Sequence, residues 1–134
     1  MALALCALAS RATAQVQGSA PFSSAGTTAE GVTEFLQKLQ KSAEADDRKT
    51  VAALVTYPLR AWNGKRTVTV HDRRELLAQY PAVFNADLRK VIAQARVESA
   101  FANWQGVMWA SGRIWIRPEG DGPLRIVTIN PKAN

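Results

Sequence analysis

The residues best suited to acid–base chemistry lie at positions 71 and 72, where the single histidine is followed directly by an aspartate. Such a pair transfers protons near neutral pH when both side chains enter one cavity. Residues that are adjacent on a strand point to opposite faces, so His71 and Asp72 cannot simply form this pair. We expect Asp72 to cap a helix, and His71 to lie on the outward face with Thr67 and Thr69.

Glu98 is the carboxylate that stands apart, because it precedes Phe101 and Trp104 at the entry to an aromatic segment. We expect it to be partly buried and to form a structural ion pair with Arg96 or Arg113 rather than to act as a base. The remaining carboxylates fall on helix starts, on polar helix faces or in a turn. The sequence has no glycine-rich phosphate loop, no nucleophile elbow and no metal-ligand spacing. We therefore expect no catalytic residue, no metal and no cofactor.

The segment 104–117, WQGVMWASGRIWIR, holds three of the four tryptophans. In strand alternation Ile114 and Ile116 share one face, and Trp115 lies between Arg113 and Arg117 on the other, as a cation–aromatic ladder. Core packing is the favoured role of the rings, and a pocket or an interface is the alternative. If a ligand binds, its candidate contacts are Tyr57, Tyr80, Glu98, Trp104, Met108, Trp109, Arg113, Trp115 and Arg117.

The first fourteen residues resemble an export signal. Ala2–Ala9 is a short apolar stretch, and Ala12-Thr13-Ala14 is a small-x-small cleavage site before Gln15. A basic segment after Met1 is missing, so either the true start lies upstream or the signal is atypical; a buried N-terminal helix is the alternative. We expect a periplasmic or secreted protein, with a signal peptide at 1–14, a flexible lead-in at 15–27 and one domain at 28–134.

Cleavage there would remove the single cysteine and lower the formal charge from +6 to +5. A mature chain without cysteine excludes a disulfide scaffold and a thiol nucleophile.

A positive net charge favours anionic partners. No run of like charges marks a dedicated site, so a mixed solvated surface is favoured. Stacking of nucleic acid on the Arg/Trp ladder is an alternative that export disfavours, and the apolar stretch is too short to span a bilayer.

Apolar spacing and turn residues predict an α+β domain. A helix is expected over 28–45, and a short one capped by Asp46-Asp47 is expected to bury Val51, Leu54 and Val55. Strands at 57–62 and 66–70 flank an Asn63-Gly64 hairpin turn. Helices are expected to begin after Asp72 and at Asn85, and three antiparallel strands are expected at 106–110, 113–117 and 124–129.

The order of the expected elements resembles the NTF2-like (cystatin-like, SnoaL-like) superfamily. The blocks TVAALVTYPLRAWNGKRTVTVHDRRELLAQY, NWQGVMWASGRIWI and LRIVTIN are similar to small exported bacterial proteins of uncharacterised function. The resemblance covers residues 36–131, although the family pattern has a small or aliphatic residue where Trp109 stands. It implies a cone in which N-terminal helices pack on a curved, mainly antiparallel sheet. It leaves the activity open, because this fold hosts enzymes, inhibitors and binding modules.

Three functions follow as hypotheses. The first is an exported, non-catalytic binding module that takes a small apolar or amphipathic ligand in a pocket, or a protein partner on the sheet face. The second is an isomerase- or cyclase-type enzyme with Glu98, His71 or Tyr57 as its base. The third is an inhibitor or immunity-type protein that binds an acidic partner. A homodimer through the sheet face is a further possibility for the Trp115 ladder.

Overall fold

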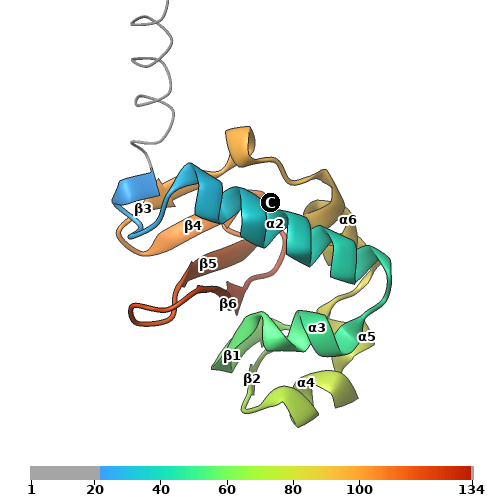
Figure 1. Cartoon of the computed structure of the whole chain (residues 1–134). Coiled ribbons are helices and arrows are strands. Elements are labelled where there is room, and N and C mark those ends of the chain that lie inside the picture. The colour runs from blue at the N-terminus through green and yellow to red at the C-terminus, as the bar shows by residue number, and fades with distance from the viewer. Residues whose placement is uncertain (1–21, 134) are drawn as a thin grey trace, which may run out of the picture.

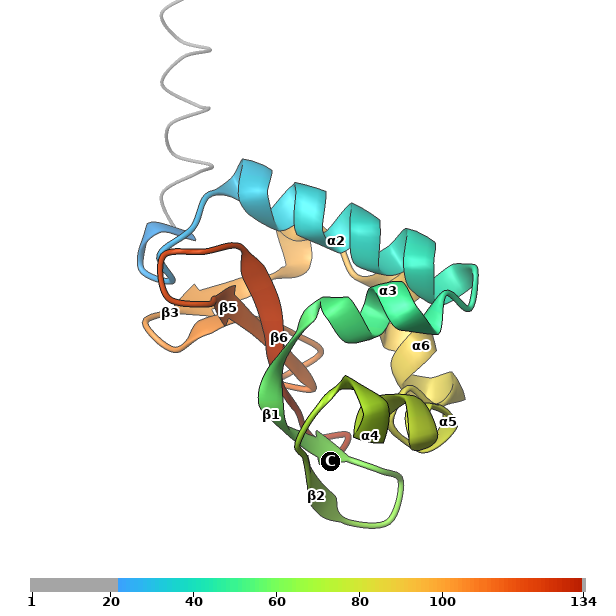
Figure 2. The ribbon, with the colours of Figure 1, turned by 60° about the horizontal axis from the view of Figure 1, so that its bottom comes forward.

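The computed structural model describes residues 22–133 and shows an α+β arrangement (Figure 1). Six strands form one curved sheet in the order β2-β1-β6-β5-β4-β3, and the helices α2 to α6 gather to one side of it (Figure 2). The expected signal peptide and residues 15–21 of the expected lead-in lie outside the described residues. None of the helices in the described part is long and apolar enough to cross a membrane.

The helices and strands follow the expected order, with two additions. The helical elements are α2 Ala29–Glu44, α3 Arg48–Ala53, α4 Arg73–Ala78, α5 Tyr80–Val83, α6 Ala86–Gln94 and the 3-10 turn η1 Val97–Ser99. The strands are β1 Val55–Trp62, β2 Thr67–Val70, β3 Phe101–Asn103, β4 Gly106–Trp109, β5 Ile114–Pro118 and β6 Leu124–Ile129.

Side-chain caps start the helices where the sequence places them. Asp72 accepts a hydrogen bond from the Glu75 amide at 2.8 Å and Asn85 accepts one from the Leu88 amide at 2.9 Å, so both predicted caps are confirmed. Helix α2 buries its predicted apolar stripe of Val32, Phe35, Leu36, Leu39 and Ala43 against the sheet side of the molecule.

The sheet is mainly antiparallel, as predicted, with one parallel pair. Strand β1 runs parallel to β6, while β6, β5, β4 and β3 pair antiparallel in succession. The register slips between Trp115 and Ile116 of β5, where the facing residues are Thr128 and Ile126. A slip of this kind is a β-bulge, which bends a sheet locally.

Four expectations are wrong in detail. Val55 begins β1 rather than ending the second helix, and β3 with the preceding η1 was not expected at all. The single third helix is two short helices that meet at Gln79, because Pro81 at the start of α5 cannot continue the hydrogen bonding of α4. The packed part of the chain begins before residue 28, since Phe22 and Ala25 are buried in the core.

Two glycines with positive φ offer a matched test of the sheet. A Cβ on Gly106 (φ +140°) would lie 2.3 Å from the Ile116 carbonyl oxygen, whereas one on Gly64 (φ +94°), in the hairpin turn, meets nothing within 4 Å. Both substitutions carry the backbone cost of a positive φ, about 1–2 kcal/mol, and only the first adds a backbone clash.

We therefore expect Gly64→Ala to lower the free energy of unfolding by about 1 kcal/mol and Gly106→Ala by about 3 kcal/mol or more, measured by urea denaturation. Equal losses in the two variants would show that β4 and β5 are not as closely paired as this register requires.

Candidate functional site on the outer face of the sheet

The space between the helices and the sheet is filled by the protein's own side chains. Val107, Trp109, Ile114, Ile116 and Ile126 point into it from neighbouring strands and are all but inaccessible. They join one continuous core with the apolar stripe of α2. Burial of alternate residues leaves the other half of each strand on the opposite face of the sheet.

Two of the predicted contacts, Trp109 and Tyr80, belong to this core. Trp109 is 3% exposed and its indole N–H donates to the Arg96 carbonyl at 2.8 Å. The Tyr80 ring stacks on Phe84 at 4.9 Å between centroids, and the Arg48 guanidinium lies over it. Burial raises the pKa of Tyr80. Both rings stabilise the fold and neither lines an open pocket.

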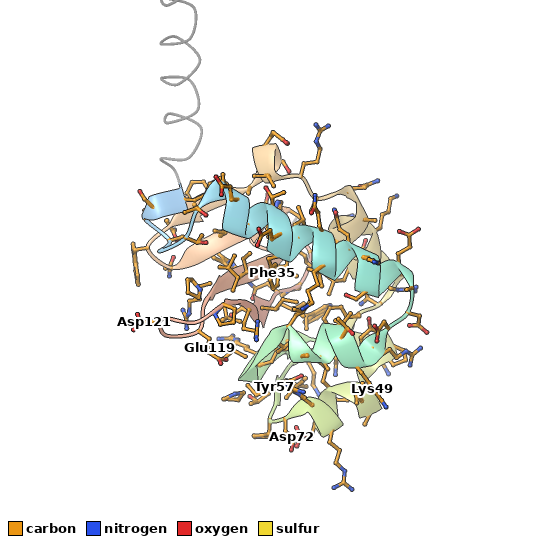
Figure 3. The ribbon with its side chains drawn as sticks, in the orientation of Figure 1. Phe35, Lys49, Tyr57, Asp72, Glu119 and Asp121 are labelled. Atoms are coloured by element: carbon orange, nitrogen blue, oxygen red, sulfur yellow. The ribbon has the colours of Figure 1, made fainter. Side chains whose placement is uncertain are left out.

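Tyr57 is partly buried and its hydroxyl donates to the Ala52 carbonyl at 2.8 Å. Burial raises its pKa to about 12, with opposing effects of Arg73 and Asp72, so the phenol is neutral and a poor base near pH 7. Figure 3 shows Tyr57 and Asp72 in the same part of the molecule, but the Asp72 carboxylate is used by the α4 cap.

His71 and Glu98 lie on the surface. The His71 imidazole pairs with Glu75, with 3.0 Å between Nδ1 and Oε2, and both side chains are well exposed. Glu98 pairs with Arg96 at 3.8 Å, as one alternative predicted, but it is exposed rather than partly buried. An ion pair in full contact with water contributes little to stability. The three bases considered for an enzyme therefore do not meet in an enclosed site.

The predicted ladder of Arg113, Trp115 and Arg117 does not form, because Arg113 leaves the strand. It is 3% exposed, and its Nη1 donates to Asp87 Oδ2 of α6 at 2.6 Å. The cause is a left-handed turn between β4 and β5, in which Ala110, Ser111 and Gly112 have φ values of 54°, 56° and 86°. This turn redirects the chain, so β5 begins only at Ile114.

One row of side chains crosses all six strands on the outer face. The register places them directly opposite one another in the order Phe101, Met108, Trp115, Thr128, Arg60 and Thr69. Phe101 is 53% exposed, and Met108 and Trp115 are partly exposed. The first three, Phe101, Met108 and Trp115, make an apolar strip at one end of the sheet. We call this strip of three residues the outer row.

Trp104 and two arginines flank the outer row. Trp104, in the turn between β3 and β4, is 82% exposed. Arg117 of β5 lies directly opposite Arg125 of β6. The Arg125 guanidinium donates to the Leu124 carbonyl at 2.9 Å and lines a hollow with Glu34 and Lys38 of α2, whereas the Arg117 side chain is exposed. Neither arginine forms an ion pair with a described carboxylate.

Arg117 also lines two open hollows. One, of about 220 Å³, lies on the outer face and is lined by Gln105, Trp115, Arg117, Val127 and Thr128. The other, of about 430 Å³, lies between the segment before α2 and the β5–β6 turn, and its lining includes Gly26, Trp104, Arg117 and Asp121. The turn that carries Asp121 and Glu119 protrudes from the sheet (Figure 3). Apolar rings beside unpaired cations are typical of a surface that binds another molecule.

The structure thus separates the nine predicted contacts into three groups. Met108, Trp115 and Arg117 share the outer face with Trp104 at its end, Trp109, Tyr80, Tyr57 and Arg113 are tied into the fold, and Glu98 stands apart. Phe101 completes the face but was not predicted as a contact, because the strand that carries it was not predicted. Arg125 was not predicted either, although its alternation with Leu124 and Ile126 in the strand predicted at 124–129 was a signal that it points away from the core.

Comparison with protein-family models, with curated proteins and with solved structures yields no match. Within residues 22–133, no three His, Cys, Asp or Glu side chains gather as a metal site would need.

The Arg113–Asp87 pair makes stability depend on pH. The hydrogen bond from Arg113 holds the pKa of Asp87 below its usual value of 3.8. A depressed carboxylate pKa adds stability above the usual value, and this stability is lost as the pH falls through the folded-state pKa. We expect Asp87→Asn to be less stable than wild type at pH 7 and the gap to close below pH 3.8, in urea unfolding at a series of pH values.

Asp121→Asn is the control for this series, since it makes the same charge change in an exposed turn. A gap between wild type and Asp87→Asn that is constant with pH would contradict the ion pair.

The exposure of Trp104 beside Arg117 can be measured by fluorescence quenching. Iodide, an anion, is expected to quench the wild-type emission more strongly than caesium, because the local potential is positive. Trp104→Phe should remove most of the accessible emission. Trp109→Phe, which removes a buried indole, should leave the quenchable part unchanged. A quenchable part that Trp104→Phe leaves unchanged would place Trp104 in the core.

Proposed function

We propose that this chain is an exported, non-catalytic binding module whose outer sheet face binds an acidic protein partner. The observation that carries the proposal is the exposed Arg117, which forms no ion pair with a described carboxylate and lines one open hollow with Trp115 and another with Trp104. An acidic side chain placed against the Arg117 guanidinium would gain an ion pair, and the rings supply apolar area to bury.

Export rests on the signal-like residues 1–14, and the NTF2-like cone rests on the resemblance of residues 36–131. The curved sheet with its helices gathered to one side (Figure 2) supports such a cone. A protein partner on the sheet is also what an inhibitor or immunity-type role requires, so that hypothesis is a special case of this proposal.

A small ligand, a second copy of the chain and an enzymatic function each have less support than an acidic protein partner. A small apolar ligand between helices and sheet would have to displace packed core side chains. A second copy of this chain, docked through the same face, would present the basic Arg117 and no acidic residue of the outer row to its partner. The isomerase- or cyclase-type alternative lacks an enclosed acid–base pair among His71, Glu98 and Tyr57.

The test is charge reversal with a matched control. Wild type, Arg117→Glu and Arg66→Glu are immobilised and exposed to a periplasmic extract, and captured proteins are purified and titrated against each variant. Arg66 lies in the exposed β1–β2 hairpin, away from the outer row. We expect an acidic partner that binds wild type and Arg66→Glu alike, and binds Arg117→Glu about tenfold or more weakly, with a reduced salt dependence.

Equal binding by both variants would overturn the proposed face. Sedimentation of the free protein tests the other occupant. A dimer that Trp104→Ser converts to monomer would assign the face to a second copy and would also overturn the proposal.

A further inference from the structure

The most unusual side chain in the described part of the protein is Arg113. A buried arginine is costly unless its donors are satisfied. A guanidinium has five N–H donors, and Nη1 donates to Asp87, while Nε is buried and has no hydrogen-bond partner within residues 22–133. The partner Asp87 is itself half exposed, so the pair is only partly enclosed.

The backbone holds Arg113 in this position through a turn that is itself strained. Left-handed φ values at two successive non-glycine residues, Ala110 and Ser111, cost of the order of 1–3 kcal/mol each. The turn is fixed from the C-terminal end of β6. The Asn130 amide donates to the Arg113 carbonyl at 2.8 Å, and its side-chain nitrogen donates to the Gly112 carbonyl at 2.8 Å. Strain maintained by such anchoring is concentrated at binding sites.

An open hollow of about 370 Å³ lies over the Arg113–Asp87 pair. Helix α6 supplies one wall, the turn supplies Ser111 and Arg113, and the chain after β6 supplies the rest. Three cations line it, Arg113, Lys90 and Lys132, against one carboxylate, Asp87. Both lysines are close enough to favour the charged form of Asp87. The hollow therefore keeps a positive charge after the ion pair is counted.

We propose that this hollow is a binding site for the oxyanion of a small molecule, a carboxylate or a phosphate. Arg113 supplies a fixed guanidinium at its base, and a planar fork of donors suits both groups. Lys90 and Lys132 close over the anion from two sides as point charges, and the Ser111 hydroxyl provides a neutral donor. Asp87 orients Arg113 and partly offsets its charge. The negative charge of Asp87 therefore lowers the affinity of the hollow for an anion. The site is separate from the outer row and does not depend on the proposed function.

The first test is a titration of the wild-type protein with inorganic phosphate and with succinate at constant ionic strength. The readouts are the NMR signals of the Ser111 amide and of the Arg113 Nε–H group. The double variant Lys90→Gln, Lys132→Gln removes the two mobile cations. The double variant Lys49→Gln, Lys65→Gln makes the same charge change on exposed residues outside the hollow.

We expect saturable shifts in wild type and in the Lys49/Lys65 variant, and binding about tenfold weaker in the Lys90/Lys132 variant. Saturation by phosphate alone assigns the site to phosphates, by succinate alone to carboxylates, and by both to either group. Shifts that do not saturate, or equal dissociation constants in the two double variants, would mean an adventitious ion only and would overturn the proposal.

Asp87→Asn separates binding from a purely structural ion pair. Loss of the carboxylate removes a like charge next to the incoming anion and frees the Arg113 Nη1 donor. We expect this variant, although less stable, to bind the oxyanion about fivefold more tightly at neutral pH. An ion pair with only a structural role predicts lower stability and unchanged or weaker binding, and that result would overturn the proposal.

Discussion

Burial of alternate residues on one face of the sheet is the constraint on which the rest of the structure depends. Once Val107, Ile114 and Ile116 are committed to the core, Met108 and Trp115 must project from the other side. A slip of one residue would exchange the two sets, so the hydrophobic free energy of the core also fixes the composition of the outer row. The aromatic surface is in this sense a consequence of the core.

The β4–β5 turn is where this alternation is interrupted. With a regular two-residue hairpin, Arg113 would have followed Trp115 and Arg117 to the outer face. Three consecutive left-handed residues instead carry it to the helix side of the sheet, where it meets Asp87. Ala110 and Ser111 have no intrinsic preference for that conformation. It is imposed by the ion pair and by the two hydrogen bonds from Asn130, all of which join residues far apart in the chain.

The difference between local signals and contacts that join distant residues explains which features the sequence could predict. Local signals were sufficient for the cap at Asp72, the stripe of α2, the Asn63-Gly64 turn and the inward faces of Ile114 and Ile116. They were insufficient for β3, a three-residue strand that exists only because Phe101 and Ala102 pair with β4. They also failed for Arg113, whose position depends on tertiary contacts. The burial of Trp109 agrees with the core role that was favoured for the rings, and it is completed by the distant carbonyl of Arg96. Of the candidate contacts, those with regular strand alternation were placed on the correct face.

Gly112 occupies the inner side of that turn, and a Cβ there would lie 3.3 Å from the Trp115 indole nitrogen and 3.5 Å from the Met108 sulfur. The turn therefore touches the outer row on one side and carries Arg113 on the other. Thermodynamic linkage requires that the coupling free energy between two binding sites be the same whichever site is filled first. A partner that pressed on Trp115 and shifted the turn would change the affinity of the Arg113 hollow by the same factor by which an anion there changed the affinity for the partner. The absence of a side chain at residue 112 is what lets the Trp115 indole and the Met108 sulfur lie against this turn.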